Sequence, residues 1–255
     1  MELNRFKNSF SKMSHDQFKP LKIPLSNTKS IIIITSSADL DSASDFIADF
    51  FESDDLNQIR SILVQASIEE KFIELLRAKL RYVNKNALIS TTIQEMEEQI
   101  EKLKQKGFPI IKNNDIDETG SKATVIKCPR SLITSNNLPL ITLEVFRTTK
   151  EAISFAKGSL SVGIWCENIS IAYEFINSLN EAFQIWFNSS HGKIHPKIPF
   201  YNGEVICEDP DIRNKSMSAS AGSIVEIFDN VQFITKFRSS SFQTVVIPFG
   251  ESFAN

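Results

Sequence analysis

The residues best suited to covalent chemistry are three cysteines, because a thiolate is both a strong nucleophile and a soft metal ligand. Cys128, Cys166 and Cys207 are widely separated, and none belongs to a CxxC pair. Scattered cysteines in odd number do not predict a disulfide framework, and they suit a reducing compartment. Cys166 ends an apolar segment, so it is interpreted as a small buried thiol rather than a reactive one.

A zinc site is a second kind of chemistry that the sequence could support, since His191 and His195 lie close together and Cys207 follows them. Pro196 and Pro199 make that segment a loop, and no second close pair of ligands is present. Histidines in such loops are usually only polar surface. We therefore predict no metal site.

The composition argues against two classes of partner. The formal net charge is −3, with lysine and arginine interleaved among acidic residues, which is not the basic surface that nucleic acid requires. Neither a GxGxxG nor a GxxxxGK phosphate-binding segment occurs. The longest apolar runs, 31–34 and 245–249, are far too short to cross a bilayer. We predict no nucleic-acid partner and no membrane span.

The elements that would position any site alternate between short apolar segments and amphipathic ones, the order that produces a parallel sheet covered by helices. The predicted fold class is therefore α/β. Strands are expected at 30–35, 61–65, 122–127, 138–146, 161–165 and 184–188. Helices are expected at 38–51, 67–80, 93–106, 148–157 and 169–183.

Local signals mark several helix ends and helix faces. Ser67 with Glu70 and Thr148 with Glu151 have the spacing of capping boxes, and Gly107 stands where a helix-ending glycine would. The first helix has its apolar stripe at Leu40, Ala43, Ile47 and Phe50. The last helix has its stripe at Ile169, Ala172, Ile176, Leu179 and Phe183.

The predicted domain organisation has four parts. Residues 1–23 form an N-terminal arm, 24–206 the α/β domain, 207–222 a polar, serine-rich linker, and 223–255 an apolar tail with strand-like segments. The tail is expected to bury itself against this domain, against a missing part of a longer assembly, or against another subunit. The arm is amphipathic and basic enough to be considered as a mitochondrial transit segment, but Glu2 and Asp16 favour an ordinary packing arm, so a cytoplasmic location is expected.

Three stretches, in order, resemble the catalytic half of the aldehyde dehydrogenase superfamily over residues 24–203. The first is NTKSIIIITSSADLDSA, the second LPLITLEVFRTTKEAISFAKG, and the third begins at SVGIWCENIS and ends near Phe200. The matching residues are Lys29, Ser30, Ala38, Asp39, Leu40, Asp41, Ala43, Pro139, Phe146, Arg147, Thr148, Glu151, Ala152, Ala156, Trp165, Asn168, Trp186, Asn188, Pro196, Pro199 and Phe200. The resemblance implies a parallel-sheet catalytic domain whose cofactor-binding Rossmann half is missing.

The same resemblance places the family's nucleophilic cysteine near Leu56, which cannot attack a carbonyl. Asp54, Asp55 and Asn57 stand beside it, and they are interpreted as solvated loop residues rather than a substitute nucleophile. The general-base glutamate falls at Pro24 or Leu25, neither of which accepts a proton.

The ribose-binding glutamate of the family falls on Ser135, whose hydroxyl cannot accept from both ribose oxygens as a carboxylate can. We therefore expect no bound cofactor. A chain that is only a fragment would explain the missing half but not Leu56, Leu25 or Ser135, which lie inside the region of resemblance.

The resulting hypothesis is a non-catalytic relative of the aldehyde dehydrogenases, near aldehyde dehydrogenase family 16, whose second module lacks the catalytic cysteine. Such a protein would act through contacts within a homo-oligomer or with a complete aldehyde dehydrogenase subunit. The alternative is an NAD(P)-dependent oxidoreductase acting on an aldehyde, with the cofactor half supplied by another subunit. That alternative needs a nucleophile that the sequence does not place at the expected position.

Overall fold

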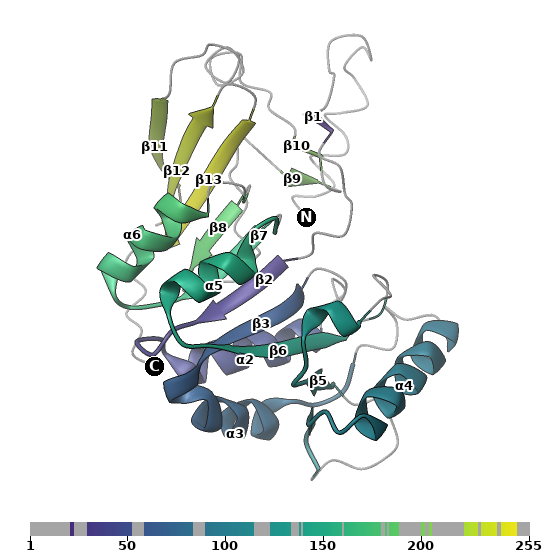
Figure 1. Cartoon of the computed structure of the whole chain (residues 1–255). Coiled ribbons are helices and arrows are strands. Elements are labelled where there is room, and N and C mark those ends of the chain that lie inside the picture. The colour runs from purple at the N-terminus through teal and green to yellow at the C-terminus, as the bar shows by residue number, and fades with distance from the viewer. Residues whose placement is uncertain are drawn as a thin grey trace.

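A computed structural model describes residues 21–22, 30–52, 59–83, 90–114, 123–133, 138, 140–159, 161–179, 182, 184–188, 200–201, 204–205, 222–228, 231–238 and 241–248. The main feature is a ten-stranded sheet with helices on both faces (Figure 1). Its parallel centre has the order β8 (Gln184–Phe187), β7 (Ser161–Trp165), β2 (Ser30–Ile34), β3 (Ile59–Gln65), β6 (Ile141–Phe146) and β5 (Val125–Ile126).

Further strands extend the sheet at both ends. β4 (Ile110–Ile111) pairs with β5 at one end. At the other end the tail forms a meander of β11 (Gly222–Phe228), β12 (Val231–Arg238) and β13 (Ser241–Pro248), and β13 lies parallel to β8. The tail thus pairs with this chain's own domain, one of the three possibilities that its sequence left open. Three short strands, β1 (Leu21–Lys22), β10 (Glu204–Val205) and β9 (Phe200–Tyr201), form a separate antiparallel sheet.

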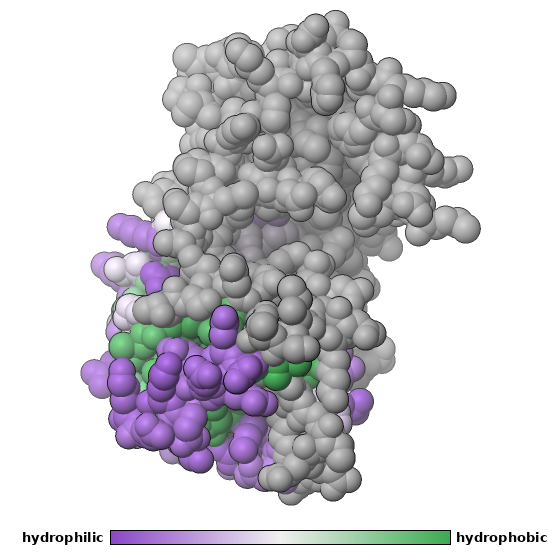
Figure 2. All heavy atoms as spheres, turned by 90° about the vertical axis from the view of Figure 1, so that its right-hand side faces the viewer, coloured by the Kyte–Doolittle hydropathy of each residue, from purple (hydrophilic) through white to green (hydrophobic). Residues whose placement is uncertain are grey.

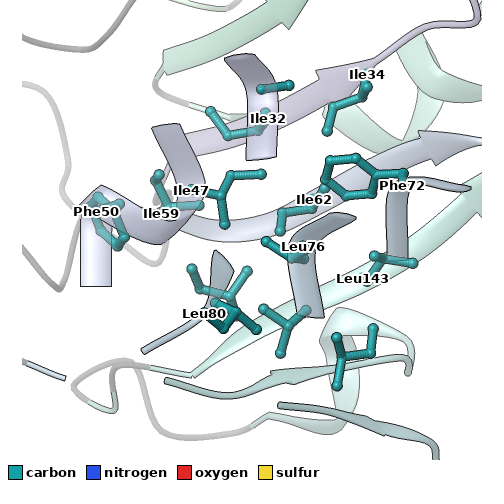
Figure 3. Close-up of a cluster of buried hydrophobic side chains, with 14 of the residues drawn as sticks. Ile32, Ile34, Ile47, Phe50, Ile59, Ile62, Phe72, Leu76, Leu80 and Leu143 are labelled. Carbon is teal, nitrogen blue, oxygen red and sulfur yellow. The ribbon is translucent and has the colours of Figure 1, made fainter. Parts of the chain in front are cut away.

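Strand β2 is buried on both faces, as a strand in the middle of a parallel sheet must be. Successive side chains of a strand point to opposite faces, so its four isoleucines divide between two cores. Ile32 and Ile34 join the cluster under α2 (Leu40–Glu52) and α3 (Glu69–Lys79), part of which Figure 3 shows. Ile31 and Ile33 join the cluster under α5 (Thr149–Ala156) and α6 (Ile169–Ser178).

A third, smaller core lies at the β5 end of the sheet. Met96 and Leu103 of α4 (Ser90–Gln105) pack with Ile126 of β5. The helix ends as predicted, because Gly107 adopts a φ of 84° and its N–H donates to the carbonyl of Lys104 at 2.9 Å. Residues 106–109 separate the helix from β4.

Three ion pairs connect helices to their neighbours. Lys79 of α3 reaches Asp41 and Asp45 of α2 at 2.7 Å each, and Lys127 pairs with Glu69. Polar residues dominate the described surface on the side of the molecule in Figure 2, where a smaller apolar area is also visible. Among the described helices, none has both the length and the apolar content needed to span a bilayer.

The predicted strands and helices of the domain are all present, with ends shifted by a few residues. One cap was predicted wrongly. Ser67 lies inside a short 3-10 helix, Ala66–Ile68, so α3 begins after Ile68 and no side chain caps it. The other cap is confirmed at Thr148, whose hydroxyl accepts from the N–H of Glu151 at 3.3 Å, and the Glu151 carboxylate accepts from the N–H of Arg147, the residue before the cap, at 2.7 Å.

The stripe predicted for the last helix is only partly right. Ile176 and Leu179 are buried, whereas Ile169, the first residue of α6, is 72% exposed. The helix also ends at Ser178 rather than continuing to Phe183, which lies outside the described residues. The arm before Leu21 and the linker 207–221 lie outside them as well.

Candidate functional site

The family positions for the nucleophile, the base and the ribose contact each come before a strand of the parallel centre in the sequence. Leu56 comes before β3, Leu25 before β2, and Ser135 between Ile133 and β6. All three positions lie outside the described residues. β2, β3 and β6 are direct neighbours and parallel, so the described residues at their amino ends lie at one edge of the sheet, the amino edge, and this edge is taken as the candidate site.

Arg60 is the most unusual residue at this edge, since it is a charged side chain only 9% exposed. Its guanidinium donates a hydrogen bond to the carbonyl of Ile133, which links the start of β3 to the segment that precedes Ser135. Burial lowers the pKa of Arg60 below its usual value. On the other side of the edge, the hydroxyls of Ser30 and Ser161 hydrogen-bond to each other between β2 and β7.

A chain of polar side chains runs inward from this edge between β3 and β6. The Thr142 hydroxyl donates to the Ser61 hydroxyl at 3.0 Å, and Ser61 in turn donates to Glu144 Oε1 at 3.5 Å. The backbone N–H of Arg130 donates to the same carboxylate oxygen at 3.2 Å. Each of these groups hydrogen-bonds to another part of the protein. This network of side chains therefore connects β3 and β6 and does not present a free base to a substrate.

Cys128 is a described thiol on which the charge of Glu144 acts, and it is not activated. The side chain is 3% exposed. Burial raises its pKa to about 11, and the negative charge of Glu144 adds to the rise. A nucleophilic cysteine needs the opposite environment, partly exposed and close to a positive charge. Cys128 therefore stays protonated at neutral pH.

The carboxyl edge of the sheet carries a second polar cluster, around Cys166. This thiol is 4% exposed, donates to the carbonyl of Asn168 at 3.3 Å, and lies 3.5 Å from the hydroxyl of Ser37. The side chain of Asn188 makes two hydrogen bonds with the backbone of Cys166, accepting from its N–H at 2.7 Å and donating to its carbonyl at 2.9 Å. Asn188 has a φ of 45°, a left-handed conformation that asparagine tolerates better than most residues.

The neighbouring groups at the carboxyl edge are also bonded internally. Asn168 accepts from two backbone N–H groups of α6 as its N-cap, and Asp39 accepts from the N–H groups of Asp41 and Ser42 at the start of α2. Gln65 accepts from the N–H of Ser36 at 2.7 Å. Ligands of α/β folds commonly bind at this edge of the sheet. In this protein, the hydrogen-bonding groups just described instead connect loops to helix starts and strand ends.

Asn168 and Asn188 belong to the residues that carry the family resemblance, but the sequence predicted no role for either. Their positions in the sequence could have indicated a role. Each stands within a few residues of the end of an apolar strand, where an Asn can cap a helix or bridge two chain segments. Ser37 and Gln65 gave no such signal. Their contacts depend on which strands become neighbours, which spacing does not predict.

Metal binding has no support from the described ranges, which hold no group of three His, Cys, Asp or Glu able to share an ion. His191, His195 and Cys207 lie outside those ranges. The absence of a metal site therefore stays a prediction.

Comparison with known proteins identifies the family of this chain from one match and its fold from others. The family described as "Protein of unknown function (DUF1487)" matches residues 26–205, well over half of the chain. Among solved structures, a betaine aldehyde dehydrogenase from Staphylococcus aureus in complex with NAD+ matches with a TM-score of 0.58, 20% identity and coverage of 81% of this chain and 47% of that one.

Two further structures give the same result. Lactaldehyde dehydrogenase from Escherichia coli matches with a TM-score of 0.57 and 17% identity, covering 74% of this chain and 45% of that one. An NAD-dependent benzaldehyde dehydrogenase from Corynebacterium glutamicum matches with a TM-score of 0.52 and 16% identity, covering 64% and 40%. This chain therefore spans less than half the length of each of these enzymes. It belongs to the DUF1487 family, and it has the α/β fold of part of an aldehyde dehydrogenase.

Proposed function

We propose that this chain is a non-catalytic, aldehyde-dehydrogenase-like protein that acts through protein contacts, either in a homo-oligomer or with a complete aldehyde dehydrogenase subunit. The observation that carries the proposal is Leu56, which stands where the resemblance places the nucleophilic cysteine. Aldehyde oxidation by this class of enzyme requires a thiolate that adds to the carbonyl carbon. An aliphatic side chain has no lone pair for that step.

The described cysteines support the same proposal. A thiol from elsewhere in the chain could replace the lost one only if it were exposed and easily deprotonated. Cys128 is buried and has a pKa of about 11, and Cys166 is buried with its S–H bonded to the carbonyl of Asn168. Neither has the environment of a nucleophile.

The loss of the general-base glutamate and of the ribose-binding glutamate is a second, independent argument for the proposal. Leu25 and Ser135 replace two carboxylates that serve separate steps, hydrolysis and cofactor binding. A single substitution could be compensated locally, whereas three at one site remove the reaction and its cofactor together. The kinship to a branch with a cysteine-less second module, aldehyde dehydrogenase family 16, is part of this proposal.

Calorimetry with NAD and NADP tests the cofactor side of the proposal. The full chain, alone and mixed with a complete aldehyde dehydrogenase, is titrated with each dinucleotide. We expect no heat of binding to this chain and no increase in the binding capacity of the mixture. Binding at micromolar concentration that is lost on Ser135→Ala would support the alternative, an oxidoreductase whose cofactor half comes from another subunit.

Light scattering coupled to size-exclusion chromatography tests the contact side. We expect the chain to elute at a mass above its monomer mass of 28.8 kDa, or to co-elute with an aldehyde dehydrogenase subunit. A strict monomer under both conditions would contradict the proposal.

A further inference from the structure

The two ends of the ten-stranded sheet are very unequal. One end is β4, which has two residues, and the other is β11, which has seven. β11 pairs with β12 in an unbroken antiparallel register from Gly222 to Phe228. Within the described part of the chain, β12 is the only strand beside it. Alternate backbone N–H and C=O groups of β11 therefore point away from the sheet.

An edge of this length is normally protected, because its backbone groups form a template for another strand. Proteins protect such edges with charged side chains, above all lysine, with proline, with a bulge or a very short strand, or by covering the edge with a helix or loop. β11 has the sequence GSIVEIF, with neither proline nor lysine, and its pairing with β12 shows no bulge. Apart from the single charge of Glu226, the strand itself carries none of these devices, which favours pairing as its role.

The lengths of the other edges indicate what can pair with it. A second copy joined head to tail would match β11 with β4, leaving five of the seven residues unpaired. The outer strands of the small sheet, β1 and β9, also have only two residues each. Among the described strands at sheet edges, only β11 itself has a matching length, and pairing two identical strands antiparallel gives a closed two-fold dimer.

The register of such a pair follows from the strand's midpoint. Full-length pairing places Val225 opposite Val225 of the second copy, and it places Ile224 opposite Glu226. The only charged residue of the strand, Glu226, then does not stand opposite its own copy, which would be unfavourable. A one-residue shift of the axis to Glu226 would place the two carboxylates opposite each other.

We propose that β11 pairs antiparallel with β11 of a second copy of this chain, with Val225 on the two-fold axis, so that two sheets become one continuous sheet. This inference rests on the proposed function, because it names the partner and the surface for the protein contacts. It assigns the contact to backbone hydrogen bonds rather than to the helices.

Cysteine cross-linking tests the register in the full-length chain. In a Cys207→Ser background only the buried Cys128 and Cys166 remain. Val225→Cys places two thiols directly opposite each other on the axis, whereas Ile224→Cys, the matched control, places each thiol opposite Glu226. Under mild oxidation we expect a covalent dimer from Val225→Cys at a yield at least fivefold above that of Ile224→Cys.

A second measurement uses the unmodified protein, so that a poorly folded variant cannot decide the matter. Hydrogen exchange is followed at dilute and at concentrated protein. We expect the amides of 222–228 to exchange more slowly at high concentration, and those of 231–238, already paired on both sides, to stay unchanged.

Three outcomes would overturn the inference. Equal cross-linking of the two variants would exclude this register. A monomer with exchange independent of concentration would exclude the dimer. An oligomer without added protection of 222–228 would exclude β11 as its contact but would leave the proposed function standing. NAD binding, by contrast, would contradict the proposed function and leave the dimer contact unaffected.

Discussion

At the scale of single residues, Cys128 shows how position controls reactivity. Its thiol is 3% exposed, and its pKa is raised from an ordinary value of 9.0 to about 11, first by burial and then by Glu144. We predict that native protein at pH 8 leaves Cys128 unmodified by iodoacetamide, while protein unfolded in urea is modified there. Peptide mapping by mass spectrometry measures both. Rapid modification of Cys128 in the native state would show that it can act as a nucleophile.

The same thiol makes stability depend on pH in a definite direction. Its pKa is higher in the folded than in the unfolded chain, so folding favours the protonated form. The contribution is fully present below about pH 9 and is lost as the pH rises towards 11. We predict that the unfolding free energy of wild type, measured relative to Cys128→Ala, falls by about 2 kcal/mol over that range. Urea denaturation at several pH values measures it, and a constant difference would refute the assignment.

Asn188 makes a second residue-scale prediction, since its amide holds the backbone of Cys166 at both N–H and C=O. Asn188→Ala removes both hydrogen bonds and places alanine at a φ of 45°. We predict a loss of about 2 to 4 kcal/mol in the free energy of unfolding. Asn188→Gly, the matched control, loses the same bonds without backbone strain and is expected to lose less. Equal losses would show that strain plays no part.

At the scale of elements, two similar capping signals had different outcomes. Thr148 caps α5, whereas Ser67 lies in a 3-10 helix and caps nothing. We predict that Thr148→Ala lowers the free energy of unfolding by about 1 kcal/mol, and that Ser67→Ala changes it by less than about 0.5 kcal/mol. Chemical denaturation measures both. A similar loss for the two variants would contradict the caps as described.

Elements were the part of the fold that sequence could predict best. Apolar runs such as 31–34 and 161–165 have the short length that is typical of buried strands rather than of helices, so length identified them where period alone could not. Ile169 was assigned wrongly because helical period identifies a face of the helix but not how exposed the first residue of that face is. The 3-10 helix before α3 was missed because Ser-x-x-Glu spacing fits either arrangement until the strand end is fixed.

The candidate site was less predictable than the elements. Leu56, Leu25 and Ser135 could be named from the resemblance, but they lie outside the described residues, so their predicted places stay predictions. The contacts of Arg60, Ser37 and Gln65 join residues that are distant in sequence. Only the strand order brings such residues together, and no local pattern encodes that order.

At the scale of the whole molecule, the sheet is continuous from the domain into the tail. β13 joins β8 through the pairs Thr244 with Gln184, Val245 with Ile185 and Val246 with Trp186, and Val245 is fully buried in the core under α5 and α6. The tail is therefore part of the same sheet as the candidate site. A sheet of this extent places β11 at one end and the small α4 core at the other (Figure 1).

The central claim, that the chain does not oxidise aldehydes, is tested most directly by turnover. Purified full-length protein is incubated with NAD or NADP and a panel of aliphatic and aromatic aldehydes, alone and with a complete aldehyde dehydrogenase that carries an inactivated nucleophile. We predict no aldehyde-dependent rise in absorbance at the wavelength of the reduced cofactor. Formation of reduced cofactor that is abolished by substitution within 54–57 would contradict the account.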